Sequence, residues 1–82
     1  MHVLKTWPEH FEAIVSGRKR CEVRFNDRDY RVGDSLILKE WNPLDQSYTG
    51  RIVKKYISHI LHGGEFGIQS GYVVLSLQTL RP

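Results

Sequence analysis

The pattern of hydrophobic and polar positions predicts one short helix near the start of the chain. Phe11, Ile14 and Val15 fall at positions i, i+3 and i+4, so they share one face of a helix. Pro8 stands before them, where the first residue of a helix needs no N–H donor. We therefore expect a helix over residues 8–16 that packs through this apolar face.

The next segment, residues 20–25, alternates between apolar and charged side chains, which is the pattern of a half-buried strand. We expect the apolar side to face the core, with a buried and unreactive cysteine, and the charged side to face outward. The apolar set is Cys21, Val23 and Phe25, and the charged set is Arg20, Glu22 and Arg24.

Four further segments are predicted to be strands: 3–6, 35–41, 52–61 and 71–78. The third of these is ambiguous, because its apolar residues also fit a helical spacing. They are mostly β-branched or aromatic, however, and a bulge would disturb the period of two in a twisted strand. We therefore interpret residues 52–61 as a strand.

The resulting order is one strand, one helix and then four strands, which is typical of the α+β class. About five mostly antiparallel strands cannot form a doubly wound sheet. A small β-barrel with the helix on one side is the natural arrangement, because closure removes exposed strand edges. The chain of 82 residues is expected to form a single domain over residues 1–82.

Composition narrows the class of protein only a little. Hydrophobic residues make up 40 % and charged residues 26 % of the chain, which are ordinary values for a globular domain. No apolar run is long enough for a membrane helix, and no signal peptide is visible. The single cysteine and the spacing of the histidines predict neither a disulfide nor a metal site. We expect a soluble, cytoplasmic protein without a cofactor, most simply a monomer.

The positive charge is concentrated in one window, residues 18–31. This window holds six basic and three acidic residues, an excess that equals the net charge of +3 of the whole chain. Such a cluster fits an anionic partner, but a solvated face with local ion pairs is an equally good interpretation. The bases are Arg18, Lys19, Arg20, Arg24, Arg28 and Arg31, and the acids are Glu22, Asp27 and Asp29.

A longer pattern runs through the helix and the first charged strand. It consists of Lys5, Pro8, Phe11, Ile14, Gly17, Lys19, Glu22 and Arg24, followed by Val32-Gly33-Asp34. In this order it resembles the signature of the ASCH (activating signal cointegrator homology) domain, a member of the PUA-like superfamily. The segments Tyr48-Thr49-Gly50-Arg51 and Gly71-Tyr72-Val73-Val74-Leu75 resemble a compact branch of these domains that carries no assigned function.

This resemblance implies a PUA-like β-barrel with a cleft beside the helix, lined by the signature residues, and RNA or a nucleoside-like compound as ligand. Some ASCH domains are hydrolases that deacylate N4-acetylcytidine, and others are reported to cleave RNA. The deacylases carry a threonine nucleophile two residues before the arginine. In this chain that position is Glu22, which argues against threonine-based amide hydrolysis.

The signature residues have chemistry of their own. Glu22 and Arg24 are two positions apart on a strand and so share a face, where Arg24 could bind a phosphate or a base edge. Lys19 suits a phosphate, and Glu22 could orient Arg24, accept a proton from a base amino group or act as a general base. Trp7, between Lys5 and Pro8, could stack on a base or cap the barrel core.

The sequence therefore favours a small RNA- or nucleotide-binding module, with Lys5, Trp7, Lys19, Glu22 and Arg24 as its ligand-binding residues. One alternative is a hydrolase acting on a modified nucleoside or an RNA phosphodiester, with Lys19 and Glu22 as the candidate catalytic residues. A second alternative is a protein-interaction domain whose basic face is merely solvated.

Overall fold

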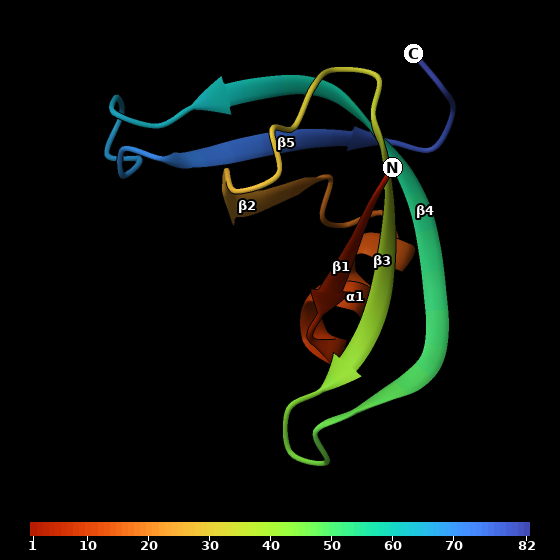
Figure 1. The fold of residues 1–82 in the computed structure, drawn as a ribbon. Coiled ribbons are helices and arrows are strands. Elements are labelled where there is room, and N and C mark those ends of the chain that lie inside the picture. The colour runs from red at the N-terminus through yellow and green to blue at the C-terminus, as the bar shows by residue number, and fades with distance from the viewer.

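The computed structural model describes residues 1–82 as a curled five-stranded sheet with one short helix after the first strand (Figure 1). The strand order in the sheet is β1-β3-β4-β5-β2, and only the β1–β3 pair is parallel. This is a mostly antiparallel half-barrel, in agreement with the expected fold class. The elements are β1 (His2–Thr6), α1 (Pro8–Val15), β2 (Cys21–Phe25), β3 (Ser35–Asn42), β4 (Ser47–His62) and β5 (Tyr72–Gln78).

The long strand β4 gives the sheet its curl. Its first part pairs with β3 and its second part with β5, so one strand of 16 residues belongs to both arms of the molecule (Figure 1). One arm is formed by β1, β3 and the first part of β4, and the other by the second part of β4, β5 and β2. The register shifts between Ile57 and His59, and such a shift is how a strand bends. The ambiguous segment 52–61 is thus a strand, as predicted, and the irregularity explains why its apolar residues depart from a period of two.

The two edge strands, β1 and β2, are joined by side chains rather than by main-chain pairing. Arg24 of β2 donates from Nη2 to the main-chain oxygen of Lys5 over 2.7 Å, and Arg28, in the loop after β2, donates from Nη1 to that of Val3 over 2.9 Å. Val3 and Lys5 are two residues apart on β1, so their carbonyl groups point toward the same open edge. Two guanidinium groups therefore occupy the place where a closed barrel would have a ladder of hydrogen bonds.

The core lies inside the curl, with α1 packed against it. The helix buries Phe11 and Ile14, as predicted, but Val15 is 45 % exposed, and the helix ends at Val15 rather than at residue 16. Helical spacing places three residues on one face, and a helix of this length has room to bury only part of that face. The buried cluster comprises Leu4, Ile14, Tyr30, Leu36, Leu38, Ile57, Val73, Leu75 and Leu77.

The alternation of β2 was predicted correctly, but the predicted direction of its two faces was wrong. Glu22 is buried, whereas Val23 is 56 % and Phe25 is 54 % exposed, and Cys21 is only half-buried. The register with β5 gives the reason, because Glu22 lies opposite Leu75, a fully buried core residue. Directly opposed residues of antiparallel strands share a face, so the charged face of β2 is the inner one.

Candidate functional site

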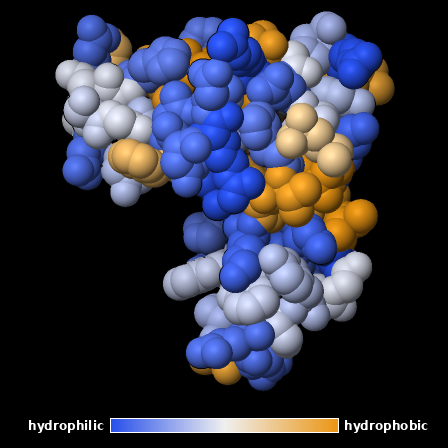
Figure 2. All heavy atoms as spheres, viewed as in Figure 1, coloured by the Kyte–Doolittle hydropathy of each residue, from blue (hydrophilic) through white to orange (hydrophobic).

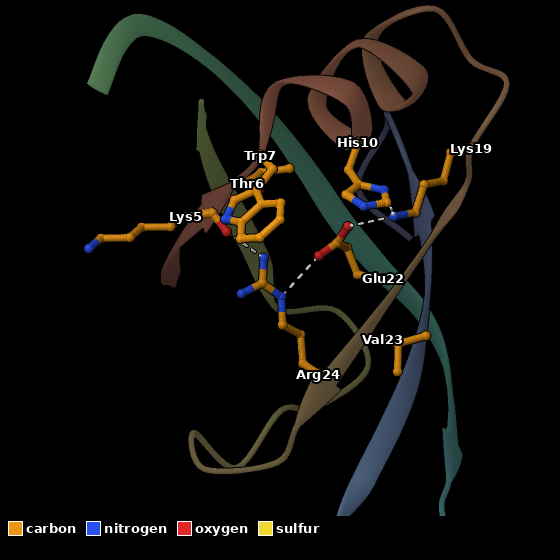
Figure 3. Close-up of a pocket in the computed structure, with 8 residues that line it drawn as sticks. All are labelled: Lys5, Thr6, Trp7, His10, Lys19, Glu22, Val23 and Arg24. Atoms are coloured by element: carbon orange, nitrogen blue, oxygen red, sulfur yellow. Dashed lines mark hydrogen bonds and ion pairs between the residues drawn. The ribbon is translucent and has the colours of Figure 1, made fainter. Parts of the chain in front are cut away.

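A pocket of about 450 Å³ lies where β1, α1 and β2 meet. All five ligand-binding residues expected from the sequence line it, together with three that were not expected (Figure 3). We call it the β2 pocket. Its lining residues are Lys5, Thr6, Trp7, His10, Lys19, Glu22, Val23 and Arg24.

The carboxylate of Glu22 lies at the centre of the β2 pocket (Figure 3). Its Oε2 accepts a hydrogen bond from Nε of Arg24 over 2.9 Å, and its Oε1 lies 3.4 Å from Nζ of Lys19. The side chain is only 5 % exposed, and a charge so far from water is tolerated only where opposite charges and hydrogen bonds compensate it. These two contacts explain how β2 can turn a glutamate toward the core.

Two of the three guanidinium nitrogens of Arg24 donate hydrogen bonds within the protein. Nε binds Glu22 and Nη2 binds the main-chain oxygen of Lys5, while Nη1 makes no hydrogen bond within the chain. The guanidinium is therefore held at both ends and remains partly exposed. A fork fixed in this way keeps one edge with N–H donors available to a ligand.

Lys19 comes from the turn between α1 and β2, whose direction could not be predicted from a period. The structure places its ammonium group between Glu22 and His10, and Nζ donates to Nδ1 of His10 over 3.2 Å. This ammonium group is partly exposed as well. Lys19 and Arg24 thus approach Glu22 from two sides, and together these three charges leave the pocket with one net positive charge.

Lys5 and Trp7 lie at the rim of the β2 pocket, but they differ in what they present to it. The side chain of Lys5 points away from Arg24 (Figure 3), and its Nζ lies 4.0 Å from the ring centroid of Trp41. Lys5 thus meets the pocket through its carbonyl oxygen and not through its charge. Trp7 precedes α1, is 53 % exposed and lies over the pocket mouth next to Arg24 (Figure 3).

Three residues that line the pocket were not expected from the sequence: Thr6, His10 and Val23. Thr6 shares a strand face with Leu4 and so was not distinguishable from a core residue, yet its buried hydroxyl has no hydrogen-bond partner in the protein. His10 is a single histidine on the helix, and no spacing pattern in the sequence marks it as a pocket residue. Val23 was assigned to the core, and its exposure follows from the same β2 register that buries Glu22.

A second buried carboxylate holds the helix in place. Glu40 on β3 accepts a hydrogen bond from Thr49 Oγ1 over 2.6 Å, and its Oε2 lies 3.7 Å from Nη1 of Arg51. Arg51 also pairs with Glu12 of α1 over 3.2 Å and lies above the ring of Phe11. This cluster ties α1 to the β3–β4 hairpin, and it thereby fixes the helical wall of the β2 pocket.

No three histidine, cysteine, aspartate or glutamate side chains come together as a group that could hold a metal ion. The helix α1 lacks the length and apolar character needed to cross a membrane.

On the face seen in Figure 2 the surface is mostly hydrophilic, with hydrophobic residues gathered where the two arms meet.

Comparison with known proteins places this chain in a family. An uncharacterized 12.9 kDa protein of Escherichia phage P2, encoded in the GpA 3' region, is 38 % identical over 60 residues. The match covers 73 % of this chain and 53 % of the phage protein, so the chain spans about half the length of the curated relative it matches. Residues 1–77 match the model of a domain of unknown function, DUF3850. The chain therefore belongs to the DUF3850 family.

Proposed function

We propose that this domain binds RNA or a nucleotide-like ligand in the β2 pocket. The observation that carries the proposal is the buried carboxylate of Glu22, which holds Lys19 and Arg24 in place below an exposed indole. A stacking surface next to fixed cationic donors is the combination that nucleotide sites use.

Each group has a distinct part in this proposal. Trp7 offers an aromatic face to a base, and stacking of this kind contributes about 1–3 kcal/mol per base. The free Nη1 of Arg24 and the ammonium group of Lys19 bind phosphate or a base edge. Glu22 acts mainly as a positioning residue, since both of its oxygens already contact these cations.

The fold supports the same proposal. A curled sheet with its helix after the first strand, and a pocket beside that helix, is the arrangement that the resemblance to ASCH domains implies. We propose that DUF3850 and ASCH domains share this PUA-like architecture. RNA is the ligand class that such a relationship favours, and the single net positive charge of the pocket suits an anion.

A fluorescence titration tests the proposal. In a Trp41→Phe background Trp7 is the only tryptophan, because the chain has two. Short single-stranded RNA should then quench its emission, with an affinity that falls as salt rises. Lys19→Ala and Arg24→Ala should each weaken binding roughly tenfold, the loss expected for one charge-assisted hydrogen bond.

The matched control is Arg31→Ala. Arg31 is strongly exposed and pairs with Asp29 outside the β2 pocket, so its removal changes the net charge equally and should leave the affinity unchanged. The melting temperature of each variant is measured first, because Arg24 also joins β1 to β2. No binding at tens of micromolar RNA in low salt would refute the proposal, and equal losses in Arg24→Ala and Arg31→Ala would indicate unspecific attraction.

One observation favours a hydrolase as a second candidate. Lys19 links His10 and Glu22 in a chain of contacts of 3.2 Å and 3.4 Å, and such groups can move protons in a pocket. A panel of acylated nucleosides and a labelled RNA would detect turnover. Activity must disappear in Lys19→Ala and in Glu22→Gln, and activity that survives both changes would exclude this pocket as its site. If neither binding nor turnover is found, the protein-interaction alternative remains.

A further inference from the structure

A second pocket, of about 340 Å³, adjoins the β2 pocket at the C-terminal end of α1. Lys19 lines both pockets, so they are neighbours on one surface. The other basic residues of the second pocket are Arg20, which precedes β2, and Lys55, which comes from β4. Two segments that are distant in the sequence, residues 19–20 and β4, thus bring three cations to one hollow.

The charge of the second pocket differs from that of the β2 pocket. No acidic side chain lines it. Arg20 donates from Nε to the main-chain oxygen of Gly17 over 3.2 Å, and Lys55 donates from Nζ to the hydroxyl of Thr79 over 3.0 Å. Because these partners are neutral, the positive charge of Arg20 and Lys55 is not compensated within the protein. We call this hollow the basic pocket.

We propose that the natural ligand is a single-stranded polynucleotide, with one nucleotide in the β2 pocket and the phosphate of a neighbouring nucleotide in the basic pocket. This inference rests on the proposed function and specifies its ligand class. An aromatic, mixed-charge pocket suits a base, whereas a purely basic one suits a phosphate. Lys19 lies between the two and contacts the backbone that connects them.

The shared lysine is what distinguishes a strand from a single nucleotide. A mononucleotide fills the β2 pocket alone and leaves Arg20 and Lys55 unused. A strand passes over Lys19 from one pocket to the other, and each phosphate it places near a cation releases counterions and adds to the salt dependence of binding. The proposal therefore predicts that affinity rises with ligand length and that the rise depends on the basic pocket.

The test compares a mononucleotide with short single-stranded RNAs of increasing length, in the same Trp41→Phe background. Lys55→Ala should weaken RNA binding about threefold to tenfold and reduce the slope of log affinity against log salt by about 1. It should leave mononucleotide binding unchanged. Arg20→Ala should behave in the same way, and it serves as an independent variant if Lys55→Ala is poorly folded.

Lys54→Ala is the matched control. Lys54 neighbours Lys55 on β4 and so points to the opposite face of the strand, with its Nζ 5.4 Å from the ring centroid of Tyr56. It lines neither pocket, and its loss should not affect RNA binding. Equal effects of Lys54→Ala and Lys55→Ala would overturn the proposal.

Three other outcomes also decide the question. RNA that binds no more tightly than the mononucleotide overturns the polynucleotide proposal but leaves the nucleotide-binding function intact. An acidic peptide that binds as tightly as RNA of equal charge shows that the surface recognises charge alone, which overturns it as well. Absence of binding by both nucleotide and RNA refutes the proposed function itself, and this inference with it.

Discussion

Arg24 donates a hydrogen bond from Nη2 to the main-chain oxygen of Lys5, 2.7 Å away, and so joins the two edge strands of the half-barrel. The same guanidinium binds Glu22 through Nε in the β2 pocket. One side chain therefore connects the closure of the fold to the candidate site. A change in the pocket at this position must also change how firmly β1 is held against β2.

Replacing Arg24 by lysine should loosen β1 while preserving the charge. A lysine has a single nitrogen and cannot bind Glu22 and the Lys5 carbonyl together in this geometry. We expect the free energy of unfolding to fall by about 1–2 kcal/mol, with faster hydrogen exchange in residues 2–6. Denaturant unfolding and exchange measurements check this, with Arg31→Lys as control. Unchanged exchange in β1 would contradict the bridging role.

Replacing Glu22 by glutamine should destabilise the protein although the shape is kept. The amide cannot compensate the charges of Lys19 and Arg24, and hydrogen bonds to charged groups contribute about 1.5–3 kcal/mol each. Both cations are partly exposed and partly recover by hydration, so we expect a net loss of about 1–3 kcal/mol in denaturant unfolding. The control is Glu65→Gln, in an exposed loop, which should have no measurable effect on stability. A Glu22→Gln protein as stable as the parent would show that the contacts of Glu22 with Lys19 and Arg24 do not stabilise the fold.

Two buried hydroxyl groups without partners, on Thr6 and Tyr30, should respond differently to removal. Thr6 lines the β2 pocket and Tyr30 does not. Thr6→Val and Tyr30→Phe should each leave stability unchanged or raise it by about 1 kcal/mol, because each removes an unsatisfied polar group. Only Thr6→Val should weaken ligand binding, if the hydroxyl bonds to the ligand. Thermal unfolding and the fluorescence titration separate these effects, and equal affinities in both variants would exclude Thr6 from the binding site.

The contact between His2 and Asp34 should make stability depend on pH in the acid range. The hydrogen bond from His2, at 2.8 Å, lowers the pKa of Asp34 below its ordinary value of 3.8, and the main-chain N–H of Arg31 adds to this. A carboxyl whose pKa is lower in the folded state stabilises above its unfolded pKa, and the contribution disappears as pH falls through the folded value. Asp34→Asn should therefore be less stable than the parent protein at pH 6, and this difference should shrink at pH 3. A difference that is the same at both pH values would contradict the assignment.

The sequence by itself determined the elements of this protein. Helical spacing of Phe11 and Ile14 and the alternation in β2 depend on local geometry, which a single segment carries within itself. Residues 52–61 of the long strand β4 were recognisable from their β-branched and aromatic side chains, although a bulge disturbed the period and β4 itself runs from Ser47 to His62. Most of the lining of the β2 pocket was predictable as well, because the ASCH-like signature contains Lys5, Lys19, Glu22 and Arg24, and the position and aromatic ring of Trp7 pointed to it.

Only the tertiary structure decided which way these elements face. The alternation of side chains divides β2 into two faces but does not show which face is buried. The pairing of Glu22 opposite Leu75 decides that the charged face is the inner one. The ammonium group of Lys5 turns to Trp41, and His10 and Thr6 join the site, through contacts between separate segments. The basic pocket likewise exists only because β4 carries Lys55 to the end of α1. Local patterns fix the repeat of a segment, whereas its orientation depends on the neighbours against which the fold packs it.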